Sequence, residues 1–280
     1  MSTNVTIAVA FSVLLAPSTG GCADADFADR VKVAEVPECA VGPSLVEATP
    51  TYDAWALAQL KANPMQILKP GYANMPEHLA WDYSACLDVA KQQAGPALRA
   101  FRVDDFASIY SAQPRNPTEA WFVEDKQRIL EWISNEQEFE LPAQSLMMIH
   151  ASPSFGALGR VVTFAGGSGR SIVIPFEIEP SLVTGLYYEF QGFSDDGELY
   201  LHLLVPLSLE GLADAPHGSH LGYSGDQIYS DKDLYEQYLR AAKGFVETHA
   251  ETIMPQLNSL DRFVRSIEIT ATRGPENSSE

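Results

Sequence analysis

The chain has 280 residues, of which 46% are hydrophobic and 10% aromatic, and its 37 acidic against 18 basic residues give a formal net charge of -19. This apolar content is sufficient for one sizeable core and a single folded domain. The strong negative charge opposes phosphate backbones and anionic lipid surfaces, which excludes nucleic acid as a partner.

The N-terminal segment has the pattern of an export signal. Met1–Gly21 contains no charged residue, and Val5–Ala16 is nearly all apolar. The run is shorter than the roughly 18 apolar residues of a membrane-spanning helix, but it suits the hydrophobic region of a signal peptide. We therefore expect residues 1–25 to be a signal peptide and the protein to be extracytoplasmic.

The signal segment has two alternative processing sites. Thr19-Gly20-Gly21-Cys22 resembles a lipobox, in which the cysteine becomes the lipidated first residue of a bacterial lipoprotein, although that motif normally has Leu where Thr19 stands. Ala23-Asp24-Ala25 fits the small-x-small rule for ordinary cleavage. The first site predicts a lipoprotein held at the membrane through Cys22, and the second predicts a secreted or periplasmic protein.

Two cysteines remain whichever site is used. Cys39 and Cys86 form an even pair, and two leftover thiols outside the cytoplasm are usually joined. We therefore predict a disulfide between them, with two buried unpaired thiols as the alternative. A zinc site is disfavoured because no CxxC or Cys/His spacing accompanies these residues.

The first half of the chain combines a polar arm with mixed elements. Residues 26–50 are polar and contain proline, which is typical of an extended arm or tether before a single domain at 51–272. Thr51–Leu60 fits a short helix and Lys69–Pro76 a loop. A helix is expected over Glu77–Ala94, because Pro76 precedes it and Gly95-Pro96 ends it.

A strand and a long helix are expected next. Ala97–Val103 is expected to be a strand, and Asn116-Pro117-Thr118 opens the clearest helix of the chain. Six of its residues fall near helical spacing, namely Trp121, Phe122, Asp125, Ile129, Trp132 and Ile133. This largely apolar stripe indicates a core-facing helix rather than a ligand platform.

The pattern then changes to strands. Four β-rich runs form two pairs, Leu158–Phe164 with Arg170–Ile178 around Gly166–Gly169, and Gly185–Phe193 with Glu198–Leu207 around Ser194–Gly197. Asp-Gly between alternating apolar runs is a strong hairpin signal, so the sheet is expected to be largely antiparallel. Asp195 and Asp196 are expected to be solvated turn residues rather than a catalytic pair.

The C-terminal part is expected to be mainly helical. In order, it contains a loop at Glu210–Ser230, a helix that Ser230 and Asp233 start and that runs to about His249, a helix within Met254–Ser266, a strand at Ile267–Thr270 and a disordered tail at 273–280. The whole layout predicts an α+β fold, an antiparallel sheet flanked by helices. It is weakly similar to the PsbP/Mog1 type of exported domain.

Two segments carry a further resemblance. Leu186–Phe193, with Asp195-Asp196-Gly197 and Tyr200–Pro206, resembles the "YtFQG-t-DG-yYv-P" hairpin of a group of uncharacterised bacterial exported proteins and lipoproteins. Pro255–Ile267 is similar to that group's "P-L--LD--v-Si" signature. The match covers roughly Ala97–Ile269 and implies no known activity.

Candidate metal ligands gather in one loop. His217 and His220, with Asp214 and Asp226 nearby, could hold zinc or copper through neutral imidazoles. The alternative is two solvated loop histidines. His202 alternates with Tyr200 and Leu204 along a strand, which favours a sheet position over a ligand role.

Other motifs do not fit catalysis. Gly166–Gly169 precedes a strand rather than a helix, so it is expected to be a turn and not a phosphate cradle. Gly222–Asp226 lacks the G-x-S-x-G spacing that a nucleophilic Ser224 requires. No residue is predicted to be catalytic.

The sequence therefore predicts an exported envelope or surface protein that binds a protein or a small ligand without catalysing a reaction. The alternative is a metal-dependent or hydrolytic extracytoplasmic enzyme that uses residues 214–226. No cofactor is expected, and membrane contact is expected only through an N-terminal lipid.

Overall fold

The computed structural model describes residues 27, 29–33, 41–46, 78–82, 97–106, 119–134, 145–146, 152–177 and 179–270. The predicted signal peptide with Cys22, the Cys39–Cys86 pair, the helix at Thr51–Leu60, the loop at Lys69–Pro76 and the tail at 273–280 lie outside these residues.

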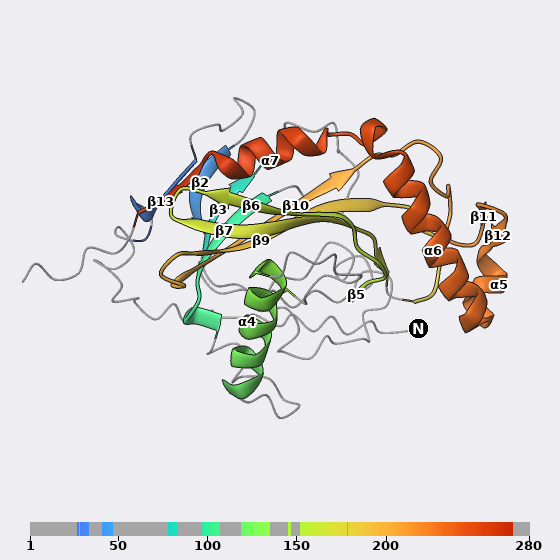
Figure 1. The fold of residues 1–280 in the computed structure, drawn as a ribbon, viewed down its shortest axis with the longest axis horizontal. Helices are drawn as coiled ribbons and strands as arrows, with labels where there is room; N and C mark the ends of the chain where they lie inside the picture. The colour runs from blue at the N-terminus through green and yellow to red at the C-terminus, as the bar shows by residue number, and fades with distance from the viewer. Residues whose placement is uncertain are drawn as a thin grey trace, which may run out of the picture.

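The described residues form an α+β domain around an antiparallel sheet of seven strands, as the sequence predicted (Figure 1). Across the sheet the strands are β2 (Val41–Val46), β3 (His78–Asp82), β4 (Ala97–Arg102), β10 (Leu199–Leu207), β9 (Leu186–Ser194), β7 (Gly167–Ile174) and β6 (Ala157–Phe164). Sequential hairpins join β6 to β7 and β9 to β10, so their pairing needs no crossover.

Three small ribbons and a few helices complete the described part of the domain. The ribbons pair β1 (Val31–Val33) with β13 (Ile267–Ile269), β5 (Ser152–Pro153) with β8 (Phe176–Glu177), and β11 (Ser219–His220) with β12 (Tyr223–Ser224). The helices are α4 (Glu119–Ser134), α5 (Gly225–Ser230), α6 (Lys232–Thr248) and α7 (Leu257–Arg265), with a short 3₁₀ turn at Ala250–Thr252.

Both faces of the sheet are covered by helices. Alternate side chains of β10 point to opposite faces, as a pleated strand requires. Leu201 belongs to the core beneath α6 and α7, whereas Tyr200 belongs to a second core that includes Ile129 and Trp132 of α4. Figure 1 shows α7 and α4 on opposite sides of the sheet. Phe122, Ile129, Trp132 and Ile133 of the predicted stripe are thus core residues, as expected.

The predicted helix over Glu77–Ala94 is wrong at its beginning. His78–Asp82 is strand β3, which pairs antiparallel with both β4 and β2. Leu79 is buried in the core beneath α6 and α7. Pairing on both edges satisfies the backbone of this segment, and such tertiary contacts outweigh a weak local helix preference.

Two expectations in the C-terminal half also need correction. Asp231, rather than Ser230, caps α6, because its carboxylate accepts the Leu234 N–H at 3.0 Å. The Ser230 hydroxyl instead donates to the Asp226 and Gln227 carbonyls in the first turn of α5. The predicted loop Glu210–Ser230 contains β11, β12 and α5, whose short lengths among Gly and Ser residues hide any periodic pattern.

The glycine-rich segment is a turn followed by a strand. Only Ala165 and Gly166 lie between β6 and β7, and Gly166 adopts a φ of 82°, which favours glycine. Gly169 already belongs to β7, where an added Cβ would collide with the Phe190 ring. The glycines therefore make both the turn and a bare strip of sheet on which an aromatic ring lies.

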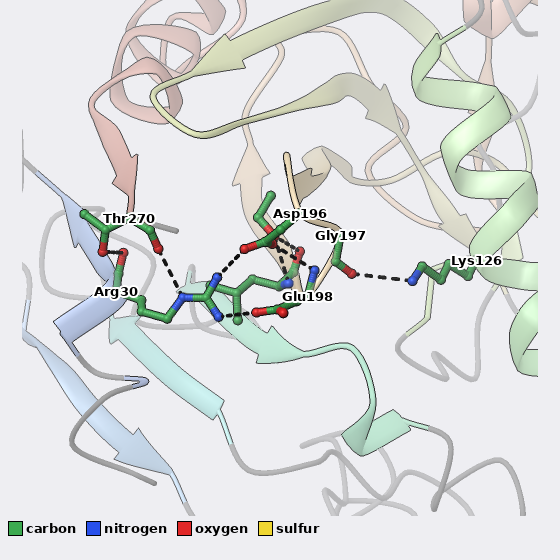
Figure 2. Close-up of polar contacts among 8 residues, drawn as sticks. Arg30, Lys126, Asp196, Gly197, Glu198 and Thr270 are labelled. Atoms are coloured by element: carbon green, nitrogen blue, oxygen red, sulfur yellow. Dashed lines mark hydrogen bonds and ion pairs between the residues drawn. The ribbon is translucent and has the colours of Figure 1, made fainter. Parts of the chain in front are cut away.

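The N-terminal residues are fastened to the β9–β10 turn by a buried arginine (Figure 2). The Arg30 guanidinium donates to Asp196 at 2.7 Å and to Glu198 at 2.8 Å, and its Nε donates to the Thr270 carbonyl at 3.1 Å. From the other side, Lys126 of α4 donates to the Gly197 carbonyl at 3.4 Å. The described start of the predicted arm is therefore docked on the domain.

The contacts around Arg30 lower the pKa of the Asp196 carboxyl. Partial burial acts to raise its pKa, but hydrogen bonds from the Ser194 hydroxyl, the Glu198 N–H and Arg30 outweigh burial and lower it. Asp196 is therefore an ionised turn residue that holds Arg30.

In the described residues no helix is long and apolar enough to cross a membrane.

Candidate functional site

The residues of the two resemblance segments meet at a buried carboxylate. Asp261 of α7 accepts hydrogen bonds from Tyr188 of β9 at 3.0 Å and from Ser171 of β7 at 3.1 Å. Arg160 of β6 forms an ion pair with it at 2.9 Å. Burial, followed by the nearby Asp261 charge, raises the Tyr188 pKa well above its ordinary value, so this hydroxyl remains a donor. The contact joins α7 to three strands and is structural.

A second buried polar group lies on the opposite face of the sheet. The Tyr200 hydroxyl donates to Gln191 Oε1 at 2.8 Å and lies 3.1 Å from Ser145 Oγ, which is then the donor in that contact. His202 Nε2 lies 3.0 Å from Glu189 Oε1, and both side chains are buried. His202 is thus a sheet residue with a partner, as the alternation predicted.

The four predicted metal ligands do not come together. His217 and Asp226 form an exposed pair, with Nδ1 and Oδ1 3.4 Å apart. His220 turns inward, where its Nδ1 lies 3.0 Å from the Tyr238 hydroxyl. Asp214 is exposed and has no contact with the other three among the described interactions. In the part of the chain that the structure describes, no three metal-ligating side chains are grouped closely enough to hold an ion.

Tyr238 holds His220 in the interior of the loop. The Tyr238 hydroxyl oxygen accepts the Val183 N–H at 2.7 Å and lies 3.0 Å from His220 Nδ1. Burial lowers the His220 pKa, opposed by the Gly211 carbonyl, and burial raises the Tyr238 pKa to about 12. Both groups therefore stay neutral near pH 7, and His220 of β11 packs against Tyr238 and Phe245 of α6.

One carboxyl near α6 is tuned toward neutral pH. Burial raises the pKa of Glu177 from 4.5 to about 6, although the hydrogen bond from the Tyr235 hydroxyl lowers it. Burial and this same carboxyl raise the pKa of Tyr235, so the tyrosine remains protonated. Glu177 can therefore take up or release a proton near pH 6, which is the clearest acid–base capacity in the described site.

We expect Glu177→Gln to stabilise the protein at pH 7 by up to about 2 kcal/mol and to have no effect below pH 4. The folded-state pKa of Glu177 is raised, so the stability that its protonated form contributes is present below pH 4.5 and is lost as the pH rises through about 6. Urea unfolding of both proteins between pH 4 and pH 8 measures the difference. Tyr235→Phe removes a hydrogen bond that lowers the Glu177 pKa, so the loss should still begin near pH 4.5 but continue to higher pH and become larger. A difference independent of pH would contradict the assignment.

The β11–β12 hairpin and the adjoining helix α5 expose two apolar side chains. Leu221, between β11 and β12, is 40% exposed, and Tyr229 of α5 is 55% exposed. Leu221 follows directly in sequence after the inward-facing His220. The sequence did not single out Leu221, Tyr229 or Glu177, because exposure and pairing depend on the packing of distant segments. It pointed to Asp261 only as part of the Pro255–Ile267 resemblance, without a role.

Comparison with known proteins gives no relative. No protein-family model, no curated protein and no solved structure matches the chain. The resemblance to a group of exported proteins and the weak similarity to the PsbP/Mog1 type therefore stay predictions.

Proposed function

We propose that this chain is an exported envelope protein that binds a protein partner and does not catalyse a reaction. The observation that carries this proposal is that the 214–226 loop buries one of its side chains and exposes another. Its buried histidine, His220, is used to pack the loop against Tyr238, whereas its apolar Leu221 is presented to solvent. Exposed apolar side chains that gather in one patch are typical of a contact surface. The β11–β12 hairpin that carries Leu221 lies at the same end of the molecule as α5, which carries the 55% exposed Tyr229 (Figure 1).

The N-terminal geometry supports a short tether. Phe27 is buried in the core, and only four residues separate it from Cys22. Even a fully extended chain spans at most about 3.6 Å per residue, so a lipid on Cys22 would lie within about 18 Å of the Phe27 backbone. We propose that the lipidated protein sits close to the membrane surface, with the β1–β13 end nearest to it.

The alternative function requires a rearrangement. A metal-dependent or hydrolytic enzyme that uses the 214–226 loop would need His220 to leave the Tyr238 hydroxyl and join His217 at the surface. That movement would expose a packed aromatic neighbourhood in which His220 lies against Tyr238 and Phe245. The binding role needs no such movement.

Intact mass of the protein purified from a bacterial envelope tests the proposal. We expect a chain that begins at Cys22, carries a diacylglycerol, and weighs two hydrogens less than the reduced form because Cys39 and Cys86 are joined. Cys22→Ser should lose the lipid, and Cys39→Ser should lose the two-hydrogen deficit. Cleavage after Ala25 with a metal or small molecule retained in the native spectrum would instead support the secreted enzyme or carrier.

A further inference from the structure

The hairpin tip between β11 and β12 has an unusual residue for its backbone. Leu221 and Gly222 have φ values of 52° and 84°, so both central residues of this two-residue turn are left-handed. Such turns strongly prefer Asn-Gly or Gly-Gly, because a bulky L residue is strained there. Leu221 therefore costs conformational energy, and 40% of its surface stays exposed to solvent.

The surroundings of Leu221 form a distinct surface, which we call the tip surface and define as residues 219–230. It contains the β11–β12 hairpin and α5, with Tyr229 exposed on the helix. Figure 1 shows these elements together at one end of the molecule, beyond α6, and the β1–β13 ribbon at the other end. A tether attached next to Phe27 thus leaves the tip surface accessible.

The tip surface lies in a strongly acidic stretch. Asp226 is an exposed carboxylate of the tip surface itself, and four more exposed carboxylates flank it in sequence, namely Glu210, Asp214, Asp231 and Asp233. Lys232 is the one lysine between residues 210 and 233. The whole chain has a net charge of -19, so this local charge is reinforced by the rest of the molecule. Positive partners are attracted to such a surface, and a second copy of the chain is repelled.

We propose that the tip surface is the docking site for a basic amphipathic segment of a partner protein. The inference rests on the proposed binding function and names where and what it binds. The apolar face of the segment contacts Leu221 and Tyr229, and its lysines or arginines face the surrounding carboxylates. Leucine stands where asparagine would fit the turn better because its side chain makes this contact.

The structure offers a variant that separates binding from folding. Leu221→Asn suits the left-handed backbone, so it should keep or raise the melting temperature, and it leaves the net charge unchanged. It removes the apolar contact alone. Val161→Thr is the matched control, because Val161 is also an exposed apolar residue, 45% exposed, but lies on β6.

The test measures binding of a synthetic amphipathic leucine–lysine helical peptide to the processed full chain at physiological salt by fluorescence anisotropy. We expect Leu221→Asn to weaken binding about tenfold, Tyr229→Ser to weaken it by a similar factor, and Val161→Thr to leave it unchanged. Equal weakening by Leu221→Asn and Val161→Thr, or no effect of Leu221→Asn, would place binding elsewhere and overturn the inference while the binding function stands.

Two further outcomes remain decisive. No peptide binding by the unmodified chain would overturn the basic segment as the occupant. The intact-mass measurement would still test export and lipidation independently of that result. Sedimentation that finds a dimer, converted to monomer by Leu221→Asn, would show that a second copy occupies the tip surface and would also overturn the inference.

Discussion

Asp261→Ala is expected to lower the free energy of unfolding by about 3 kcal/mol. The carboxylate is 2% exposed and accepts hydrogen bonds from Tyr188, Ser171 and Arg160. Its removal leaves two buried hydroxyls without their acceptor and releases α7 from the sheet. Urea unfolding followed by circular dichroism measures the change.

The neighbouring Asn258 provides the control for this effect. It accepts from the same Arg160 guanidinium at 2.9 Å but is exposed, so Asn258→Ala should change the free energy of unfolding by no more than about 0.5 kcal/mol. Tyr188→Phe removes one of the donors and should cost about 1 kcal/mol. If Asp261→Ala cost no more than Asn258→Ala, the carboxylate would not hold α7 in place.

Phe190→Ala is expected to lower the free energy of unfolding by about 3 to 5 kcal/mol. The Phe190 ring is fully buried, meets Phe164 edge-on with ring centroids 6.2 Å apart, and covers the bare backbone at Gly169. Because glycine offers no side chain that could fill the space, the cavity left by the ring should stay open. Thermal and urea unfolding measure the loss.

Phe190→Leu tests this explanation, because leucine fills part of the space and should cost less than alanine. Val161→Ala, at an exposed position of β6, should change stability by no more than about 0.5 kcal/mol. An alanine effect as small as that of Val161→Ala would mean that the sheet closes over the missing ring, contrary to the packing of glycine backbone against it.

Local patterns predicted most of the sheet and helices. Asp-Gly at the β9–β10 turn, alternation along β10 and the apolar stripe of α4 each report a property of neighbouring residues, namely turn conformation or the period of a strand or helix. The prediction of a helix over Glu77–Ala94 was wrong at its beginning because β3 forms by pairing with β2 and β4. Both partner strands are separated from β3 by long stretches of sequence, so no local pattern reveals the pairing.

The candidate site was predictable only in part. The sequence drew attention to the loop that contains His217 and His220, and that loop does lie at an accessible end of the molecule. It could not distinguish the two histidines, because His220 is drawn inward by Tyr238 of α6 and His217 pairs with Asp226 at the surface. The pKa of Glu177 likewise depends on burial beside Tyr235, which no local pattern encodes.

The sequence by itself determined the α+β class, the antiparallel hairpins, the acidic character and the expectation of export, because composition, alternation and turn chemistry act over a few residues. Only the tertiary structure decided that Asp261 is a buried anchor, that Arg30 fastens the N-terminal segment to a distant turn, and that Leu221 is exposed on a strained tip. Burial, pairing and accessibility arise when remote segments pack together, so they cannot be obtained from neighbouring residues alone.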